Sequence, residues 1–550
     1  MMESRTAEPE VEGTAMEHIE KRFKDFRNQN TYWRHSQDGT LDRFHKEYEA
    51  AVDRVRAELL GMDVPLVVNG KEIETGSWME RTSPTDTSVT VCRFPEATKE
   101  HAKQAIAVAH EAEKKWRETP WQDRAAALEK AASLYEEHFY ELCAIMTFES
   151  GKTRYEASID VDEAIDFLRF YALTMREMDG FNQEMDQPVP NERCWSKMKP
   201  YGTFAIICPF NFPVAITTGM TAAALVTGNP AIMKPATKGV LSGYRCFQLL
   251  IEAGIPDDVL QFVVGPDETV ATELTENPDI KGICFTGSKH IGTKIMAKRI
   301  QDAPASPLIV EMGGKNATIV TANADLDKAV EGCFRAAFGF QGQKCSASSR
   351  IIVDRRVKDE FVERLVARTE EAVVAEPWKK EAYMGPVIEE AKFDWYMEWV
   401  EKAKKAGRIL TGGAAVKDTD SKGWYVRPTI VDGVPVSHEM FQTELFVPIT
   451  NIYACDGIEE AVDLMNATEY GLTGGIMTED EKEAEYFFEH AECGVLYLNR
   501  KAGSSTAAVV NGQSFGGWKN SGHSGINAGG RWYLLQFMRE QSHTRVNDSD

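Results

Sequence analysis

The sequence predicts an α/β protein built from two doubly wound domains, each with a mainly parallel sheet, and three observations support this. From Gly202 onward, short β-rich runs alternate with helical runs, and a second such series starts near Pro307. Repeated strand–helix–strand order favours parallel strands joined by helical crossovers. The chain has 550 residues, which is too long for one compact core and favours two or three domains.

The N-terminal part predicts a helical arm followed by a hairpin. Residues 1–60 are acidic, and the run from Leu41 has apolar residues at helical spacing and ends in Gly61, a residue suited to a helix cap. The stretch "VPLVVNGKEIETG" reads as two strands with Asn69-Gly70 at the turn. Helices are expected over "KEHAKQAIAVAHEAEKKWRE" and over "DRAAALEKAASLYEEHFYELCAIMTFESG".

The two α/β series follow in order. The first has strand candidates "TFAIICP", "NPAIMKP", "VLQFVVG" and "IKGICFTG", with helices "TGMTAAALVT" and "VLSGYRCFQLLIEAG" between them. The second runs through "PLIVEMGG", "KNATIVTA", "DLDKAVEGCFRAAFGF", "SRIIVD" and "RPTIV". The polar, proline-bearing stretch near 183–202 and the C-terminal "YLLQFMREQSHTRV" look like interface segments, because the charged tail would be a poor exposed edge on its own.

Composition excludes several functional classes. Hydrophobic residues make up 43% and charged residues 27%, as in ordinary globular proteins, and the formal net charge is −23. Such a charge repels nucleic acid and anionic membranes, so we expect neither as a partner. The acidic N-terminus lacks the features of a signal or transit peptide, and no apolar run is long enough to span a membrane. Ten scattered cysteines without a CxxC pair indicate reduced thiols, a cytoplasmic location and no metal site.

One turn could hold a phosphate. A nucleotide would bind at the carboxyl ends of one sheet's strands, yet the chain contains no GxG. The nearest substitute is "FTGSKHIG", in which Gly287 and Ser288 end a strand and Gly292 lies in the following helix. Backbone N–H groups at that helix start could face a pyrophosphate. The alternative is an ordinary turn between a strand and a helix.

Four stretches carry residues suited to catalysis: "CPFNFP" with Asn211, "VEMGGK" with Glu311, "GQKCSASS" with Cys345, and "TELFVP" with Glu444. A cysteine nucleophile needs a thiolate, access and an oxyanion donor. Lys344 and a loop position suit the first two needs, and the Asn211 side chain with the Cys345 N–H suits the third. Glu311 could activate water. Taken singly, these residues also fit a buried thiol, a turn former and a strand-end carboxylate.

Together these stretches resemble the aldehyde dehydrogenase superfamily from about residue 65 to the end. The matching segments occur in the family's order: "CPFNFPVAI", "GNPAIMKPA", "FTGSKHIG", "EMGGKNATIV", "FGFQGQKCSASSR", "ELFVPI" and "SFGGWKNSG". The 34-residue interval from Glu311 to Cys345 agrees as well. The resemblance implies an aldehyde dehydrogenase-like fold with a β oligomerisation ribbon. It divides the chain into a helical arm (1–60), a cofactor-binding domain (61–310, with the ribbon near 183–202), a catalytic domain (311–500), and a substrate loop with a C-terminal interface segment (501–550).

The resemblance also implies a mechanism. Cys345 attacks the aldehyde to form a thiohemiacetal, with the oxyanion held by Asn211 and the Cys345 amide. Hydride passes to the nicotinamide, and water activated by Glu311 hydrolyses the thioester. The implied cofactor residues are Lys234 at the adenosine ribose, Glu444 at the nicotinamide ribose, and Phe446, Pro209 and Phe210 along the cofactor approach.

Within the superfamily, the sequence is most similar to the subfamily that oxidises L-glutamate γ-semialdehyde, the open form of 1-pyrroline-5-carboxylate, in proline degradation. Ser346 follows the nucleophile, and the Ser346 hydroxyl with the N–H groups of Ala507 and Ala508 could bind an α-carboxylate. Phe212 and Phe515 could wall the aliphatic stem. The alternative for the loop before Phe515 is a flexible linker, and Ala507 and Ser514 depart from the residues common in the subfamily.

The resemblance makes NAD the expected cofactor. After "KPA" many NAD-dependent members carry Glu, whereas this chain has Thr237 followed by Lys238. Loss of that anion relaxes discrimination against NADP, and Lys238 could attract a 2′-phosphate or could simply be solvated. We therefore expect NAD to be accepted and NADP also to be used.

Other functions fit the sequence less closely. These are an aldehyde dehydrogenase for another semialdehyde or a general aldehyde, an acylating reductase, and a non-catalytic cofactor-binding protein. Acylating relatives tend to lack the hydrolytic Glu, which is present as Glu311, and a non-catalytic protein is expected to lose Cys345, Asn211 or Glu311. We expect a small-molecule aldehyde as the partner and at least a homodimer.

Overall fold

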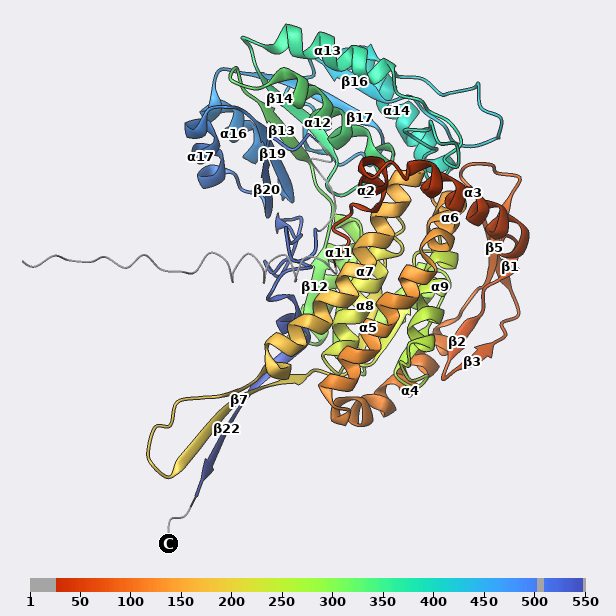
Figure 1. The fold of residues 1–550 in the computed structure, drawn as a ribbon, viewed down its shortest axis with the longest axis vertical. Coiled ribbons are helices and arrows are strands. Elements are labelled where there is room, and N and C mark those ends of the chain that lie inside the picture. The colour runs from red at the N-terminus through yellow and green to blue at the C-terminus, as the bar shows by residue number, and fades with distance from the viewer. Residues whose placement is uncertain (1–25, 502–508, 548–550) are drawn as a thin grey trace, which may run out of the picture.

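Two lobes, each built on a seven-stranded sheet, form the body of the protein (Figure 1). The computed structural model describes residues 26–501 and 509–547. Strands β8, β9, β10, β11 and β12 run parallel in the first sheet, and the hairpin β2–β3 continues it antiparallel to β10. In sheet order the strands are β12 (Leu308–Glu311), β11 (Gly282–Thr286), β8 (Phe204–Ile207), β9 (Ala231–Lys234), β10 (Leu260–Phe262), β2 (Leu66–Val68) and β3 (Lys71–Ile73).

The second sheet has six parallel strands and one antiparallel edge strand, β15. In sheet order these are β15 (Arg408–Thr411), β16 (Thr429–Asp432), β17 (Ile449–Cys455), β14 (Ser348–Asp354), β13 (Asn316–Val320), β19 (Thr473–Met477) and β20 (Val495–Leu498). The strands β8, β9 and β13 are buried along their whole length, as expected for parallel strands covered on both faces.

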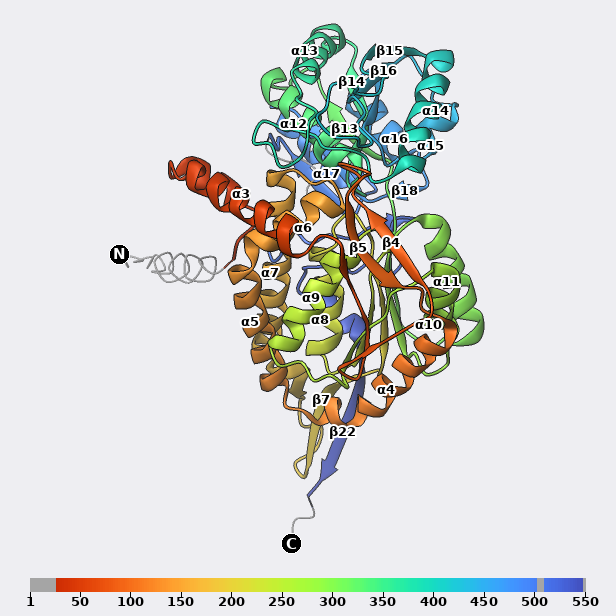
Figure 2. The ribbon, with the colours of Figure 1, turned by 90° about the vertical axis from the view of Figure 1, so that its right-hand side faces the viewer.

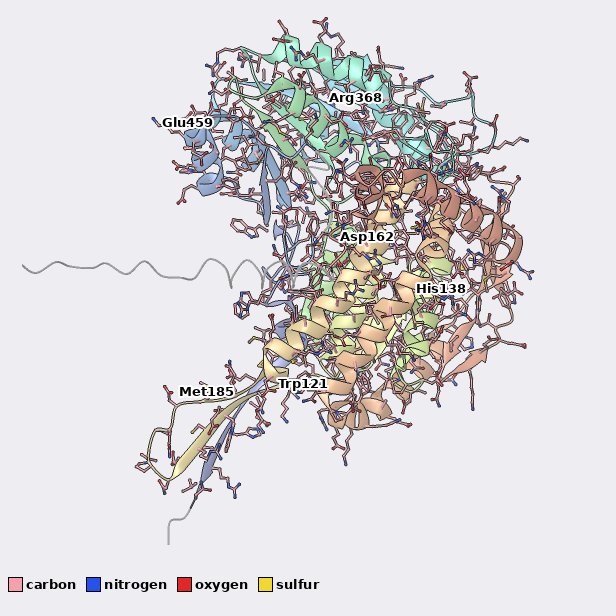
Figure 3. The ribbon with its side chains drawn as sticks, in the orientation of Figure 1. Trp121, His138, Asp162, Met185, Arg368 and Glu459 are labelled. Atoms are coloured by element: carbon pink, nitrogen blue, oxygen red, sulfur yellow. The ribbon has the colours of Figure 1, made fainter. Side chains whose placement is uncertain are left out.

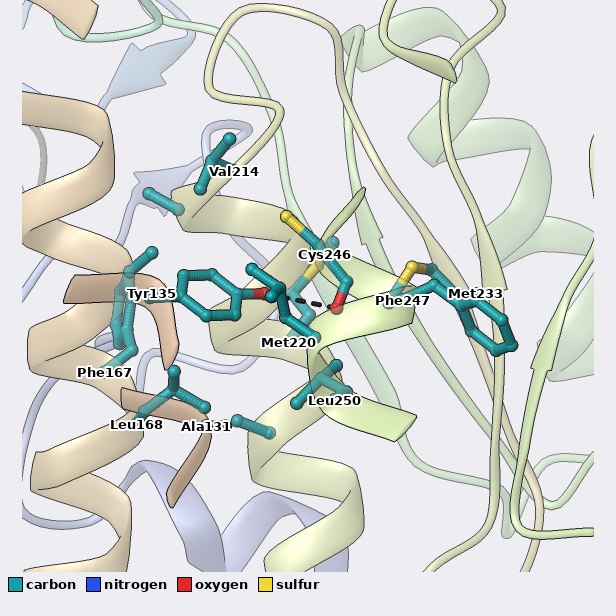
Figure 4. Packing of buried hydrophobic residues seen from close by; sticks show 14 of the residues in the cluster. Ala131, Tyr135, Phe167, Leu168, Val214, Met220, Met233, Cys246, Phe247 and Leu250 are labelled. Carbon is teal, nitrogen blue, oxygen red and sulfur yellow. Dashed lines mark hydrogen bonds between the residues drawn. The ribbon is translucent and has the colours of Figure 1, made fainter. Parts of the chain in front are cut away.

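Helices cover both faces of the first sheet (Figure 2). One face carries α8 (Ala215–Val226) and α9 (Val240–Glu252), with α5 (Trp121–Glu137), α6 (Phe139–Glu149) and α7 (Arg154–Glu177) outside them. The other face carries α4 (Lys99–Glu118), α10 (Thr272–Glu276) and α11 (Lys289–Asp302). Figure 4 shows how the outer and inner helices meet: Tyr135 of α5 reaches across the core and donates to the carbonyl of Cys246 in α9 at 3.5 Å.

Six helices belong to the second lobe among the described residues. They are α12 (Leu326–Phe338), α13 (Lys358–Glu370), α14 (Glu390–Ala406), α15 (Glu439–Gln442), α16 (Ile458–Asn466) and α17 (Glu481–His490). Smaller sheets join β1 (Met62–Asp63), β5 (Thr90–Pro95) and β4 (Trp78–Thr82), and pair β18 (Tyr470–Gly471) with β21 (Trp518–Lys519). Short helical turns are η1 (Asp179–Phe181), η2 (Asp267–Ala271), η3 (Gly339–Gly342) and η4 (Tyr533–Phe537).

A long β-ribbon projects from the first lobe (Figure 1). It consists of β6 (Asn182–Glu184), β7 (Glu192–Pro200) and β22 (Met538–Val546), and β22 pairs antiparallel with β7 along the full length of both strands. The two segments that we predicted as interface segments therefore pair with each other. Met185 at the ribbon is 51% exposed (Figure 3), and a ribbon this thin is marginally stable in water alone.

Most of the predicted strands and helices are confirmed, and two predictions are wrong. The strand Leu308–Glu311 opens no second sheet: it pairs in parallel with β11, with Ile283 opposite Leu308, so the second sheet begins at β13. The single helix predicted from Asp123 onward is two helices, α5 and α6, which are separated by the non-helical residue His138. The predicted hairpin turn is confirmed, since Asn69 and Gly70 both have positive φ (53° and 68°) as a type I′ turn requires. The domain boundaries given above stay a prediction.

The N-terminal arm packs on the body where the structure describes it. Helices α2 (Thr31–Gln37) and α3 (Leu41–Glu58) contact α7 and α6. Phe44 is fully buried, with its ring edge-on to Tyr140 of α6 at 5.5 Å between centroids. The arm is thus part of the first lobe's core from residue 26 onward.

We expect Phe44→Ala to lower the free energy of unfolding by about 3 kcal/mol, because it removes a fully buried ring and leaves a cavity. Urea unfolding followed by tryptophan fluorescence measures this. The matched control is Trp33→Ala, since Trp33 is 54% exposed and its loss should cost little. Equal midpoints for the two variants would show that the arm is not docked.

Candidate active site

The strand order of the first sheet creates a crevice. The chain moves outward from β8 to β9 and β10 on one side, and to β11 and β12 on the other, so the order reverses between β8 and β11. Ligands of such sheets bind beyond the carboxyl ends of the strands at this switch point. A cavity of about 770 Å³ lies there.

Both lobes line this larger cavity. From the first lobe come Pro209, Phe210, Asn211, Lys234, Thr237, Lys238, Gly287 and Ser288, and from the second come Cys345, Lys392, Glu444 and Phe446. All but one of the residues that the sequence assigned to a cofactor therefore face one cavity. The exception is Gly292, which lies in α11 with Met312 packed closely against its Cα and is not among the lining residues.

A second, smaller cavity of about 60 Å³ adjoins the first, because both are lined by Thr286, Met312 and Cys345. Its lining includes Phe212, Ser346 and Phe515, which the sequence assigned to a substrate, and Glu311. Ala507 and Ala508 lie outside the described residues. Cys345 is thus the thiol that both cavities share.

The loop that carries Cys345 is held by buried polar contacts. Phe340 and Gln341 adopt left-handed backbone (φ 48° and 57°), which is unfavourable for these residues. The Gln341 amide donates to the carbonyls of Gly151 (3.2 Å) and Pro386 (2.7 Å). The Asn316 amide donates to the carbonyl of Cys345 at 2.7 Å. These contacts offset the strain and fix the thiol at the cavity wall.

The surroundings of the Cys345 thiol favour its protonated form. Burial raises its pKa well above the ordinary value, the carboxylates of Glu444, Glu311 and Glu163 raise it further, and the Ser346 N–H lowers it. Our expectation that Lys344 favours the thiolate is wrong. The Lys344 ammonium is buried in an ion pair with Glu156 at 2.7 Å, so its charge is already balanced.

Glu311 is placed to act as a base. It ends β12 and lines the smaller cavity, and its Oε2 accepts the N–H of Gly517 at 3.1 Å. Burial raises its pKa to about 8, although the Gly517 hydrogen bond lowers it. A carboxylate with a pKa in this range is a stronger base than an exposed one and still ionises near neutral pH.

Asn211 lies in the loop between β8 and α8, and it is almost fully buried at the cavity wall. The far end of this loop is anchored to α7: the N–H of Ala215 donates to Asp160 Oδ1 at 2.6 Å. Asp160 in turn forms a fully buried ion pair with Lys152 at 2.9 Å, and the Lys152 ammonium lies 3.7 Å from the centroid of the Phe212 ring. One buried charge pair therefore positions the loop that presents Asn211 and Phe212.

Glu444 and Phe446 line the larger cavity from the second lobe. Glu444 Oε1 accepts the Gly314 N–H at 3.1 Å, and burial raises the Glu444 pKa to about 7. A Cβ on Gly313 would lie 2.0 Å from Glu444 Oε2, so this close approach requires glycine. Phe446 has left-handed backbone (φ 58°), and its ring packs edge-on against Phe210 at 5.8 Å between centroids.

The opposite end of the larger cavity carries lysines and a helix start. Ser288 caps α11, and its Oγ accepts the N–H of Ile291 at 3.4 Å. Lys234 Nζ lies 2.5 Å from Asp267, and Lys238 Nζ lies 2.6 Å from Glu389. The size of the cavity, the start of α11 and the lysine at the end of β9 fit a dinucleotide.

Sequence reasoning missed several residues that the structure brings to the smaller cavity. Glu163, Phe167 and Tyr171 follow one face of α7 at four-residue spacing, and Tyr533 joins them from the C-terminal segment. Glu163 Oε2 accepts the side-chain N–H of Gln29 at 3.1 Å. The four-residue spacing marks a buried helix face, but nothing in the sequence connects that face to Cys345.

Within residues 26–501 and 509–547, no cluster of His, Cys, Asp or Glu side chains could hold a metal ion. The same residues include no helix with the length and apolar character needed to cross a membrane. All ten cysteines are free thiols.

Comparison with known proteins agrees with this geometry. A family model described as the aldehyde dehydrogenase family matches residues 71–543. The chain is 37% identical over 491 residues to 1-pyrroline-5-carboxylate dehydrogenase 2 of Bacillus subtilis, covering 88% of this chain and 93% of that protein.

Solved structures give the same result. The structure is similar to that of 1-pyrroline-5-carboxylate dehydrogenase from Thermus with bound NAD, with a TM-score of 0.86 and 35% identity over 91% of this chain and 96% of that one. It is also similar to proline utilization A from Bdellovibrio bacteriovorus, with a TM-score of 0.87 and 36% identity. That match covers 91% of this chain and 52% of the longer protein.

We expect Glu444→Gln to speed the alkylation of Cys345 by iodoacetamide at pH 8.5, because the loss of a nearby carboxylate lowers the thiol pKa. Mass spectrometry of the Cys345 peptide gives the rate. Cys194, a partly exposed thiol on the ribbon, serves as the internal reference. An unchanged ratio of the two rates would mean that Glu444 does not act on the thiol.

Proposed function

The chain belongs to the aldehyde dehydrogenase family, and we propose that it oxidises L-glutamate γ-semialdehyde, formed from 1-pyrroline-5-carboxylate, to L-glutamate with NAD in proline degradation. The observation that carries this proposal is the position of Cys345 between two cavities. One cavity fits a dinucleotide, and the other is small and lined by aromatic rings, Ser346 and Glu163.

Cys345 and Asn211 carry the first step. The Cys345 sulfur adds to the aldehyde carbon, and the thiol releases its proton to solvent water as the carbon–sulfur bond forms. The Asn211 side-chain N–H and the Cys345 backbone N–H stabilise the oxygen that gains negative charge. NAD, when bound, accepts the hydride that the former aldehyde carbon loses.

Glu311 carries the second step. It takes a proton from a water molecule, whose oxygen attacks the thioester carbon, and the Cys345 sulfur leaves as the acid forms. Its raised pKa suits it to accept this proton, and the small cavity limits how much other water competes. Because a hydrolytic base is present, release of a free acid is favoured over transfer of the acyl group to another acceptor.

The residues proposed to hold NAD are those that line the larger cavity. They are Lys234, Thr237, Pro209, Phe210, Gly287, Ser288, Glu444 and Phe446. Gly292 supports this set indirectly, since its lack of a side chain lets α11 pack against Met312 of the cavity wall.

The smaller cavity supports an amino-acid aldehyde. Such a substrate carries an α-ammonium group and an α-carboxylate on a short aliphatic stem. The Glu163 carboxylate offers an acceptor for the ammonium group, the Ser346 hydroxyl a donor for the carboxylate, and Phe212 and Phe515 apolar walls for the stem. A purely aliphatic aldehyde has no ammonium group for Glu163 to bind and no carboxylate for Ser346 to bind, so we rank a general aldehyde second.

We also propose a cytoplasmic homo-oligomer of two or more chains. The ten free thiols support a reducing compartment. The ribbon supports association, because its thin sheet exposes Met185, Val189 and Val546 and would gain stability by pairing with a second copy.

An aldehyde panel tests the proposed function directly. We expect kcat/KM to be highest for L-glutamate γ-semialdehyde, and lower by about tenfold or more for succinic semialdehyde and propanal, which lack the amino group. Glu163→Gln should narrow this gap, mainly by raising KM for the amino-acid aldehyde. If another aldehyde is preferred, or if the variant lowers kcat/KM for all three alike, the substrate assignment is wrong.

Glu311→Gln tests the hydrolytic step. In the wild type, we expect the rate of acyl-enzyme hydrolysis to rise with pH through about 8 and then level off, because the carboxylate is the active form. The variant should hydrolyse the acyl-enzyme about 10²–10⁴ times more slowly and lose this pH dependence. Single-turnover kinetics from pH 6 to 10 measure both quantities. A variant that keeps the wild-type pH profile would exclude Glu311 as the base.

A further inference from the structure

Two lysines at one end of the larger cavity are neutralised by carboxylates from distant parts of the chain. Lys234 Nζ lies 2.5 Å from Asp267, and Lys238 Nζ lies 2.6 Å from Glu389. From Thr237 and Lys238, the sequence predicts a cofactor site that has no carboxylate at this position and so tolerates the 2′-phosphate of NADP. The pairing changes this expectation, because neither lysine has an unbalanced positive charge.

Of the two carboxylates, Asp267 is the one that a ligand can reach. It lines the larger cavity, whereas Glu389 is not among the lining residues. The Asp267 side chain is 73% exposed, and that of Lys234 is 1% exposed. A ligand entering this end of the cavity therefore meets the Asp267 carboxylate, with the lysine ammonium directly behind it.

The backbone fixes Asp267 at this position. Asp267 is the first residue of η2, which follows Pro266 at the carboxyl end of β10, next to β9 in the sheet. Lys234 is the last residue of β9. Adjacent parallel strands thus bring the two side chains to the same edge of the sheet, although they are 33 residues apart in sequence.

We propose that Asp267 is a cofactor-specificity residue, whose carboxylate accepts hydroxyl groups of the adenosine ribose of NAD and repels the 2′-phosphate of NADP. The proposal rests on the proposed function in one respect, that Lys234 meets the adenosine ribose. Asp267 then supplies from η2 the anion that Thr237 lacks. A ribose diol can donate to the carboxylate, whereas a phosphate dianion cannot and is repelled by it.

The test is equilibrium binding to the purified full-length protein. In Asp267→Asn the amide keeps the shape of the side chain and leaves the Lys234 charge unbalanced. We expect Kd for NADP to fall by about tenfold and Kd for NAD to rise about twofold to threefold, since an exposed carboxylate acts through partly screened charge. Isothermal titration calorimetry with NAD and NADP measures both constants.

Two nucleotide fragments separate this proposal from the proposed function. Adenosine 5′-monophosphate and adenosine 2′,5′-bisphosphate differ only in the 2′-phosphate, and their binding involves no aldehyde. Asp267→Asn should tighten the bisphosphate about tenfold relative to the monophosphate. This test does not depend on the aldehyde. If the aldehyde panel shows that L-glutamate γ-semialdehyde is not preferred, the fragment result still supports the role of Asp267.

Asp258→Asn is the matched control. It removes one carboxylate from an ion pair of similar length, Asp258 with Lys115 at 2.8 Å, before β10 and outside the larger cavity. We expect the ratio of Kd for NADP to Kd for NAD to be the same in Asp258→Asn as in the wild type. The wild-type preference for NAD should also weaken between about 0.05 and 0.5 M salt, because ions screen the repulsion.

The outcomes are distinct. The proposal would be overturned if the ratio of Kd for NADP to Kd for NAD changed less than twofold in Asp267→Asn. It would also be overturned if this ratio changed equally in Asp258→Asn. Failure of the fragments to compete with NAD would overturn it as well, because the adenosine end would then lie elsewhere. Equal melting temperatures of the two variants and the wild type confirm that each is folded.

Discussion

The hydrogen bonds of the Asn316 side chain hold the Cys345 loop in place beside the two cavities. Its amide nitrogen donates to the carbonyls of Cys345 (2.7 Å) and Ala347 (3.0 Å), and its oxygen accepts the N–H of Thr473 at 2.9 Å. One side chain thus joins β13, the nucleophile loop before β14, and the start of β19, at the point where the strand order of the second sheet reverses. A Cβ on Gly314 would lie 2.6 Å from the Asn316 oxygen and 2.7 Å from the Cys345 carbonyl, so this contact needs glycine at 314.

The same short segment couples the two lobes. Glu311 ends β12, an edge strand of the first sheet, and Asn316 begins β13, which lies between β14 and β19 in the second. Between them, Gly313 leaves room for the Glu444 carboxylate to approach the backbone, where Glu444 Oε1 accepts the Gly314 N–H. Glu311, the loop that carries Cys345 and the Glu444 side chain of the cavity wall are therefore held by the six residues from Glu311 to Asn316.

Buried carboxylates set the electrostatics around Cys345. Glu311 and Glu444 are both desolvated, with pKa values raised to about 8 and about 7, and both raise the pKa of the Cys345 thiol. In a region of low dielectric, a nearby carboxylate disfavours ionisation of the thiol. These surroundings favour the protonated thiol, and they raise the basicity of Glu311, as the proposed role in water activation requires.

The sequence by itself determined the reaction class and most of the fold. Cys345, Glu311 and Asn211 lie in short stretches whose residue types and order are specific, and the strands β8, β9 and β13 are short, mainly apolar runs. A local sequence pattern is enough to predict a structure that depends only on neighbouring residues, such as the Asn69-Gly70 turn. Tertiary structure alone decided which charges face each other. Lys344 pairs with Glu156, Lys234 with Asp267, and β12 joins the first sheet. It also brought Glu163 of α7 to Cys345. Each of these contacts joins residues far apart in the chain, and their energies depend on burial and distance, which the order of residues does not contain.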